Sequence, residues 1–377
     1  MSSSVQNNNS ILDWPNVDSP WDLLVECEAL RLGLPGATYS KCVTTTVLGV
    51  WSAYITPVVC SIGLFGTILV VVALLLHARH LNRQLIYIVF MFSANAGTNI
   101  FFAWLWILPA KGIPYATNGR SYFFSFYTSS AMCSLHRFAY SSTTTMACNF
   151  LLLASIDRFL VIFYPLKFSH VPQLYGWYAS VFTVCLSVLM MVPVAVLVTL
   201  HTVGGKLICW FALDYLWMEY YQVMLSNSSV IQPILVGFIN LSFMLRIRQY
   251  LIINHRGTTV SKQDRTHFRS SVLMFFLSAV YLIFSMPQTI AYLVAYALSR
   301  NGGDVNTEVR LAYNIADLSW NLYFLIEVFN TVVLLYFSSQ VRKYVFSLFP
   351  CLPTKLLVLN DAIIVSEHVP ATEASTD

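Results

Sequence analysis

The sequence predicts an all-α membrane protein, a seven-transmembrane helix bundle with a short amphipathic helix after the seventh span. Hydrophobic residues make up 57% of the chain and charged residues only 10%, whereas soluble domains carry about 25% charged residues. The apolar residues also fall in long runs, near the ~20 residues that a helix needs to cross a bilayer. A helix suits this setting because it satisfies its own backbone polar groups in lipid.

Seven apolar runs divide the chain into four regions. We expect an extracellular amino-terminal segment (1–50), a transmembrane domain (51–337), an amphipathic juxtamembrane helix (338–350) and a cytoplasmic tail (351–377). No internal repeat is visible, which weakens the case for a transporter built from inverted halves. The runs lie approximately at 51–76, 84–110, 131–163, 174–200, 217–245, 270–298 and 311–337.

The distribution of charge predicts the orientation in the membrane. Lys and Arg collect after the first, third, fifth and seventh runs, and positive residues near span ends tend to stay cytoplasmic. The amino-terminal segment is instead acidic and carries a glycosylation sequon at Asn8. We therefore expect a multi-pass protein of the plasma membrane with an extracellular, glycosylated amino terminus.

The strongest motif ends the third run. The stretch IDRFLVIFYPL places Asp157 and Arg158 together, with Phe159 next and Pro165 seven residues after the arginine. This pattern resembles the Asp-Arg-Tyr motif of rhodopsin-like G-protein-coupled receptors, with Phe159 in the tyrosine place. Cys133 precedes Arg158 by the same interval as the bridging cysteine of that family. An arginine that merely snorkels toward lipid headgroups would not explain this combined spacing.

The resemblance extends over all seven spans and implies a signalling mechanism. Asp157, Arg158, Phe159 and Pro165 would contribute to coupling with a heterotrimeric G protein. Asp157 would hold Arg158 at rest, and outward movement of helix six would free the arginine, as a two-state switch requires. The resemblance also implies a disulfide, which we assign to Cys133 and Cys209 because both lie on the oxidising side.

Helix six departs from the family pattern below the ligand. Pro287 resembles the family's kink, since an interior proline removes a backbone donor. Ser285 stands where the family usually has tryptophan, so an indole toggle cannot be carried over. We expect Tyr281, Cys148 and Pro233 to form the packed connector instead.

Helix seven leaves two interpretations open for a buried acid. Asn330 matches the first residue of the family's Asn-Pro-x-x-Tyr region, and Asn95 or Asn99 is nearest to its sodium-binding aspartate. Glu327 could supply the missing carboxylate, because intramembrane acids usually face a cavity or partner. Alternatively, a protonated Glu327 is hydrogen-bonded to neighbouring helices without an ion.

The resemblance places a ligand pocket between the outer halves of helices three, five, six and seven. Such sites in bundles mix aromatic walls with few polar groups, and the same positions could equally hold packing residues. The matching residues are Arg137, Tyr140, Ser141, Thr144, Gln288, Tyr292, Asp317 and Trp320.

Single positions exclude two ligand classes and favour a third. Tyr140 replaces the aspartate that pairs with monoamines, and no lysine lies between 311 and 337 to attach retinal. The acidic amino-terminal segment, together with Asp304, Glu308 and Asp317, favours a cationic ligand. The stretch RLAYNIADLSWNL at 310–322 resembles invertebrate FMRFamide-type neuropeptide receptors, which implies a short, amidated or cationic peptide. A nematode-type chemosensory receptor for small molecules stays open within the same architecture.

Other protein classes find little support. A transporter or channel would need more charged or unwound spans along its path, and no metal motif or paired nucleophile and base indicates an enzyme. We expect no cofactor, no metal and no nucleic-acid partner. After helix seven, apolar residues at helical spacing predict an interfacial helix, and Cys351 beyond it is either palmitoylated or a free thiol.

Overall fold

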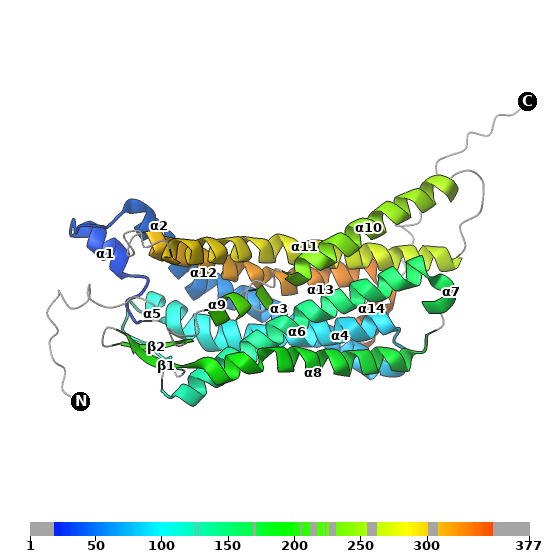
Figure 1. The fold of residues 1–377 in the computed structure, drawn as a ribbon, viewed down its shortest axis with the longest axis horizontal. Coiled ribbons are helices and arrows are strands. Elements are labelled where there is room, and N and C mark those ends of the chain that lie inside the picture. The colour runs from blue at the N-terminus through cyan, green and yellow to red at the C-terminus, as the bar shows by residue number, and fades with distance from the viewer. Residues whose placement is uncertain are drawn as a thin grey trace, which may run out of the picture.

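The chain forms an elongated bundle of long helices (Figure 1). The computed structural model describes residues 19–124, 126, 128–168, 171–203, 206–211, 217–222, 224–225, 231–254, 262–300 and 308–349. Within these residues, six helices are long and apolar enough to cross a membrane: Tyr39–Leu76, Arg83–Ala116, Ser130–Phe163, Gln173–Leu197, Val272–Ala295 and Arg310–Phe337.

These long helices contain shorter elements of differing winding. The first joins α2 (Tyr39–Val50), a π-helical turn (Trp51–Ile55) and α3 (Thr56–Leu76), and the second joins α4 (Arg83–Thr98), a π-helical stretch η4 (Asn99–Gly112) and α5 (Ile113–Ala116). The remaining elements are α1 (Val25–Arg31), η3 (Ala78–His80), α6 (Ser130–Phe163), α7 (Pro165–Phe168), α8 (Gln173–Leu197), β1 (Val198–Val203), β2 (Lys206–Phe211), α9 (Trp217–Gln222), α10 (Ile231–Asn254), α11 (Lys262–Arg300), α12 (Glu308–Tyr323), α13 (Leu325–Phe337) and α14 (Ser339–Ser347).

Short polar side chains fix where several helices begin. A Ser, Thr or Asn just before a helix can accept a hydrogen bond from an otherwise unpaired backbone N–H. Four helices begin in this way: Thr38 caps α2, Asn82 caps α4, Ser129 caps α6 and Ser338 caps α14. These caps set the amino-terminal boundaries independently of hydrophobic periodicity.

Several helix boundaries differ from the predicted runs. The first helix begins at Tyr39, inside the predicted amino-terminal segment, because the Thr38 cap and a polar first turn allow a helix without an apolar run. The fourth run ends early, since residues from Val198 onward enter strand β1. Over the fifth predicted run, 217–245, the structure describes α9 and, from Ile231, the 24-residue α10, while residues 223 and 226–230 between them lie outside the described part of the chain.

One end of the bundle carries an antiparallel hairpin. Strands β1 and β2 pair from Val198 with Phe211 to Val203 with Lys206. The hairpin lies at the same end as α1, and α7 lies at the other (Figure 1). We call the hairpin end the outer end.

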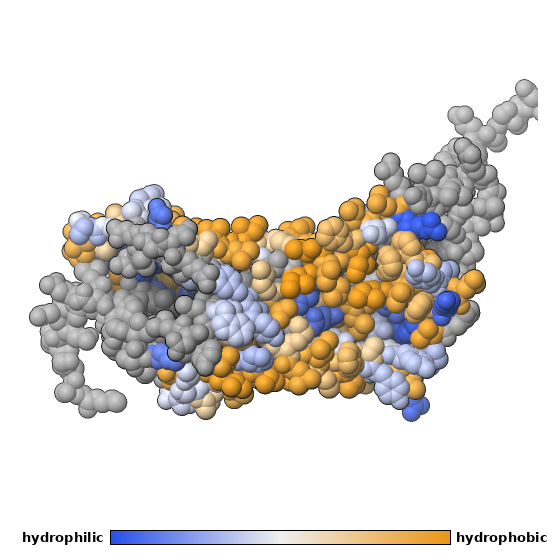
Figure 2. Space-filling view, viewed as in Figure 1, coloured by the Kyte–Doolittle hydropathy of each residue, from blue (hydrophilic) through white to orange (hydrophobic). Residues whose placement is uncertain are grey.

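Helix α6 is central and contacts α4, α8, α10 and α11. Its buried residues include Tyr140 and Phe150, each fully enclosed. Large apolar side chains elsewhere face outward, among them Phe65, Phe182 and Ile283. Figure 2 shows apolar side chains over the middle of the visible face and hydrophilic ones mainly toward its ends. This pattern suits a bundle surrounded by lipid, where exposed apolar surface carries no penalty.

Candidate functional site

The third long helix ends in a charged cluster that differs from the expected one. Asp157 lies 3.5 Å from Arg83 of α4, measured between Oδ1 and Nε, and Arg83 also donates to the carbonyl of Phe168. The expected pairing of Asp157 with Arg158 is absent from the ion pairs within the described residues. Arg83 therefore takes the acid, because it approaches from the neighbouring helix, whereas adjacent residues on one helix diverge.

Arg158 is left with an unsatisfied donor. Its Nε atom is buried and has no hydrogen-bond partner within the described part of the chain, and the same holds for Oδ2 of Asp157. Nearby, Phe159 stacks on Phe163 with 4.2 Å between ring centroids, and Pro165 is exposed at the start of α7. A buried donor without an acceptor costs free energy, so this end of α6 is poised to gain from a partner that brings one.

A sulfur and two hydroxyl groups connect α6, α11 and α12 in the middle of the bundle. The Sγ of Cys148 lies 2.5 Å from the hydroxyl of Tyr281, which lies 3.3 Å from the hydroxyl of Tyr323. Ser285, one turn beyond Tyr281, and Pro287 both lie within α11, and Ser285 is buried. Two of the three expected connector residues thus meet, and Pro233 lies within α10.

A buried polar cluster joins α3, η4 and α13. Asn99 donates through Nδ2 to Oε2 of Glu327 at 2.7 Å and to the carbonyl of Cys60 at 3.1 Å. Gly63 makes the close approach of the helices possible, because a Cβ there would come within 2.9 Å of Glu327 Oε2. Asn99 rather than Asn95 is therefore the direct partner of the buried acid.

Buried oxygen atoms without a partner among the described residues lie on the helices that pack near this acid, α3, α4, η4 and α13. Asn95 lies one turn before Asn99, and Asn330 lies about one turn after Glu327, so each pair shares a helix face. The buried oxygens that accept no hydrogen bond from the described residues are Thr67 Oγ1, Asn95 Oδ1, Asn99 Oδ1, Asn330 Oδ1 and Thr331 Oγ1. A carboxylate and neutral oxygens are the ligand types that a small hard cation takes, so the chemistry of these residues is compatible with an ion.

The outer half of α6 carries a buried cation among aromatic rings. The guanidinium carbon of Arg137 lies 4.4 Å from the ring centroid of Trp106 and 4.2 Å from that of Trp210. Arg137 donates to the hydroxyl of Tyr140 at 2.7 Å and to the carbonyl of Cys209 at 3.3 Å. Such contacts stabilise a cation without neutralising it.

Helix α9 adds a hydrogen-bond donor, Gln222, to this group. Gln222 donates to the hydroxyl of Tyr140 at 3.1 Å and to that of Ser141 at 2.8 Å. Three of the expected pocket residues, Arg137, Tyr140 and Ser141, therefore belong to one network. Gln222 was not among the expected residues, because its helix reads as part of a continuous apolar run in the sequence.

The other expected pocket residues make separate contacts. Trp320 packs on Phe102, with 4.2 Å between ring centroids, and Thr144 bonds back to the carbonyl of Tyr140. Asp317 accepts from the hydroxyl of Tyr292 at 3.2 Å and forms an ion pair with Lys111. Gln288 is fully buried in α11.

Ion pairs tie the amino-terminal segment to the outer helix ends. Asp22 lies 3.7 Å from Lys111 and from Arg310, and Glu26 lies 2.8 Å from Arg310. Each of these acids and Asp317 thus contacts Lys111 or Arg310, three acids against two bases. Asp304 lies outside the described residues and Glu308 is exposed, so the cationic ligand that the sequence favoured stays a prediction.

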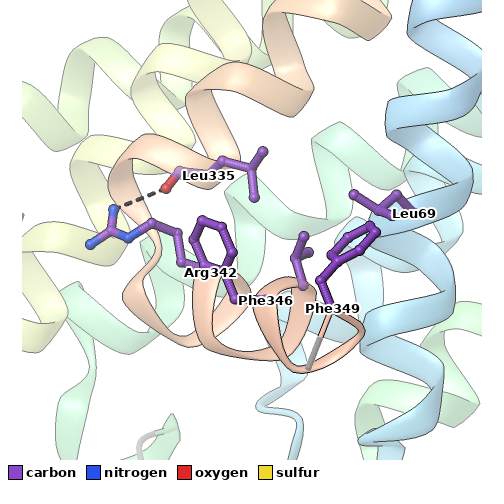
Figure 3. A pocket seen from close by; sticks show the side chains of 6 residues that line it. Leu69, Leu335, Arg342, Phe346 and Phe349 are labelled. Carbon is purple, nitrogen blue, oxygen red and sulfur yellow. Dashed lines mark hydrogen bonds between the residues drawn. The ribbon is translucent and has the colours of Figure 1, made fainter. Parts of the chain in front are cut away.

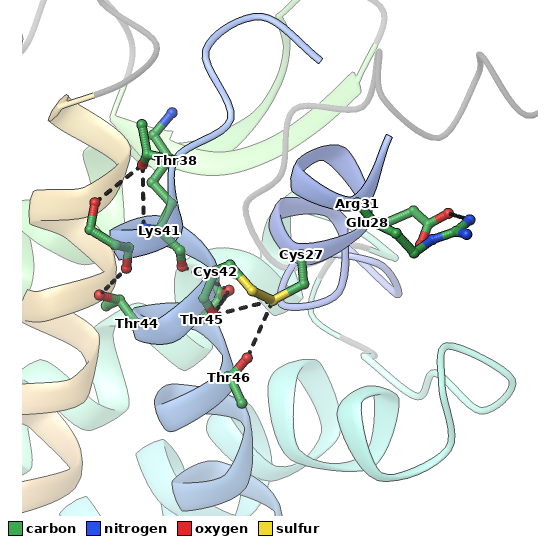
Figure 4. The surroundings of a disulfide bond; sticks show 10 residues. Cys27, Glu28, Arg31, Thr38, Lys41, Cys42, Thr44, Thr45 and Thr46 are labelled. Atoms are coloured by element: carbon green, nitrogen blue, oxygen red, sulfur yellow. Dashed lines mark hydrogen bonds and ion pairs between the residues drawn. A yellow bond between two sulfur atoms is a disulfide. The ribbon is translucent and has the colours of Figure 1, made fainter. Parts of the chain in front are cut away.

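Two disulfides stabilise the outer end. One joins Cys133 to Cys209, the pairing that the sequence implies, and so attaches strand β2 to the start of α6. The other joins Cys27 to Cys42 and links α1 to α2 (Figure 4). The second was not assigned from sequence, where both residues stood in a polar segment without a spacing that identifies a partner.

An apolar groove lies under the short helix at the opposite end. Its volume is about 310 Å³, and Figure 3 shows its lining side chains, which come from α3, α13, α14 and the residues just after α14. Arg342 at its edge donates to the carbonyl of Leu335 at 2.9 Å. The predicted glycosylation at Asn8 and palmitoylation at Cys351 lie outside the described residues.

Comparison with known proteins gives one match. Residues 66–341 match the family described as 7 transmembrane receptor (rhodopsin family), which covers most of the chain and both ends of the bundle. No curated protein matches the chain.

Proposed function

This chain belongs to the rhodopsin family of seven-transmembrane receptors, which couple an extracellular ligand to a G protein; on that premise we propose that its ligand is a short neuropeptide. The stretch 310–322, which resembles FMRFamide-type receptors, supports a peptide. It contributes Asp317 and Trp320 to the outer end of the bundle.

The coupling step depends on Arg158. Its Nε is buried without an acceptor within the described residues, while Asp157 is held by Arg83. Outward movement of α11 would admit the carboxy terminus of a G protein, whose backbone carbonyls can accept from the guanidinium. We regard the unsatisfied donor as the observation that carries the proposed mechanism.

The connector offers a route between the two ends. The Cys148–Tyr281–Tyr323 contacts join α6 to α11 and α12 in the middle of the bundle. A ligand that shifts α11 must rearrange these contacts, since α6, α11 and α12 meet there. Signalling then needs the ligand to bind one arrangement more tightly than the other.

The orientation follows from the chemistry of the two ends. Both disulfides lie at the outer end, and disulfides persist in oxidising compartments. Arg83, Arg158 and Arg342 lie at the other end, where positive charge indicates the cytoplasmic side. We place α10 as the remaining span, the outer end outside the plasma membrane with Asn8 glycosylated, and α14 with Cys351 at the inner surface.

The test is G-protein activation in cells that express the receptor. We expect a saturable response to a member of a library of amidated and free-acid neuropeptides, and its loss in Arg158→Ala with surface expression unchanged. Lys167→Ala is the matched control, because Lys167 is an exposed cation at the same end and its loss should leave signalling intact. Undiminished signalling in Arg158→Ala would refute the role of the arginine.

A chemosensory receptor for small molecules is the second candidate. The cavity beside Arg137 has a volume of about 10 Å³, which holds no more than a water molecule, so its size selects neither ligand class. Responses to small odorants alone, with none to peptides, would select this alternative.

A further inference from the structure

The strongest unassigned feature of the outer end is the charge of Arg137. Its side chain lies in the helical bundle and is 5% exposed. Within the described residues it forms no ion pair, and its hydrogen bonds go to two neutral oxygens, those of Tyr140 and Cys209. A buried charge is costly unless it is paired.

Two other cations at this end form ion pairs with acids. Lys111 pairs with Asp22 and Asp317, and Arg310 pairs with Asp22 and Glu26. Each of these two cations thus contacts an acid, whereas Arg137 has no acid partner within the described part of the chain. The imbalance is local and lies where the ligand of such a bundle binds.

The guanidinium of Arg137 has N–H donors beyond those used in its two hydrogen bonds. Trp106 and Trp210 make cation–π contacts at 4.4 and 4.2 Å, which use none of the N–H donors in a hydrogen bond. Carboxylates bind a guanidinium at its edge through two parallel hydrogen bonds. Of the five N–H donors of an arginine, Tyr140 and Cys209 each accept one.

A small cavity adjoins Arg137. It is lined by Arg137, His136, Trp106, Cys209, Phe124 and Phe126, and its volume of about 10 Å³ suits a single water molecule. Phe124 and Phe126 belong to the connection between α5 and α6, and Phe126 stacks on His136. Displacement of these loop side chains would admit a group the size of a carboxylate.

We infer that the ligand of this receptor carries an acidic group, a carboxylate or similar oxyanion, that binds Arg137 between Trp106 and Trp210. The inference rests on the proposed receptor function and names the chemical class of the ligand. Both ligand sources considered above can supply this group: an acidic side chain or free carboxy terminus of a peptide, or a small organic acid. Tyr140 positions the guanidinium, and Gln222 fixes the hydroxyl of Tyr140.

The test is ligand-induced thermal stabilisation of the purified receptor in a neutral detergent, which needs no G protein. Each probe is an acid compared with its amide: hexanoic acid with hexanamide, phenylacetic acid with phenylacetamide, and N-acetyl-Phe-Asp-amide with N-acetyl-Phe-Asn-amide. We expect concentration-dependent stabilisation by acids only. Preference for the Asp peptide over the small acids identifies a peptide source, and the reverse preference identifies a small acid.

Arg137→Gln should reduce the apparent affinity for the acid by about 30-fold or more, because one partner of a buried charge pair is removed. Arg137→Lys keeps the charge but loses the fork, so it should retain part of the affinity, and it serves if the glutamine variant does not fold. Arg310→Gln is the matched control, since Arg310 is already paired with acids; it should keep the preference for acids.

The thermal-stabilisation test either supports or overturns the binding of an acid at Arg137. Stabilisation by acids that disappears in Arg137→Gln supports the inference, even if no ligand activates a G protein. Equal stabilisation by acid and amide, none by any probe, or an acid preference that survives Arg137→Gln overturns it, and Arg137 is then a packing residue for the hairpin.

Discussion

Replacement of Asn99 by alanine should destabilise the receptor more than other polar substitutions on the same helix. The Asn99 amide donates to Glu327 at 2.7 Å and to the Cys60 carbonyl at 3.1 Å, and both contacts are buried. Without this amide, the Glu327 carboxyl and the Cys60 carbonyl lose a hydrogen-bond donor. A buried polar group that is left fully unsatisfied lowers the free energy of unfolding by about 1–3 kcal/mol. The Cys60 carbonyl lies within α3 and can accept a helical bond as well, so the total should be about 2–4 kcal/mol.

The assay is thermal unfolding of the purified receptor, scanned at one fixed rate because unfolding of such proteins is often irreversible. At about 2 °C per kcal/mol for a large chain, Asn99→Ala should lower the midpoint by about 4–8 °C. Ser93→Ala is the control: Ser93 is exposed on α4, bonds only within its own helix, and should shift the midpoint by about 1 °C or less.

A second substitution separates the hydrogen bond from general packing. Adding Glu327→Leu to Asn99→Ala also removes the buried carboxyl that lost its donor. Replacing both partners of a hydrogen bond by apolar groups can leave stability nearly unchanged. The double variant should therefore be no less stable than Asn99→Ala. A midpoint for Asn99→Ala within 1 °C of the wild type, or strictly additive losses in the double variant, would refute the reasoning.

Two further predictions concern the ion site and the disulfides. If Glu327 and the unpaired oxygens around it bind sodium, sodium chloride should stabilise the wild type more than choline chloride does, and Glu327→Gln should abolish the difference; equal midpoints in both salts for the wild type would favour the hydrogen-bonded acid without an ion. Cys133→Ser should destabilise more than Cys27→Ser, because the bridged residues are 76 and 15 positions apart and the chain-entropy cost grows with the closed loop, to about 4–5 against about 3 kcal/mol. Equal losses, measured by thermal unfolding without reductant, would contradict this order.

The third helix shows how much of the fold could be predicted. Its run at 131–163 differs from α6 by one residue at its start, because an uninterrupted apolar stretch and a Ser cap both mark the boundary. The stretch from 217 was harder. Hydropathy predicts one run over 217–245, and within the described residues this run contains α9 and the first part of α10.

The candidate site likewise has residues that the sequence predicted and contacts that it did not. Motif spacing indicated Arg158 and the Cys133–Cys209 pair, since these depend on order along the chain. The partners of charged residues could not be predicted, because Arg83 is 74 positions from Asp157 by their residue numbers and competes with the adjacent Arg158. The same applies to Gln222 beside Tyr140 and to Lys111 beside Asp317.

The sequence by itself determined the solvent and the class of the protein: long apolar runs require lipid and helices, and the Asp157-Arg158 motif with its cysteine spacing indicates the receptor family. Only the tertiary structure decided which charges are compensated. Asp22 and Glu26 of the amino-terminal segment contact Lys111 and Arg310, whereas Arg137 pairs with no acid in the described residues. Net charge is a sum over residues, but the free energy of a buried charge depends on the atoms within a few ångströms of it, and those are set by packing.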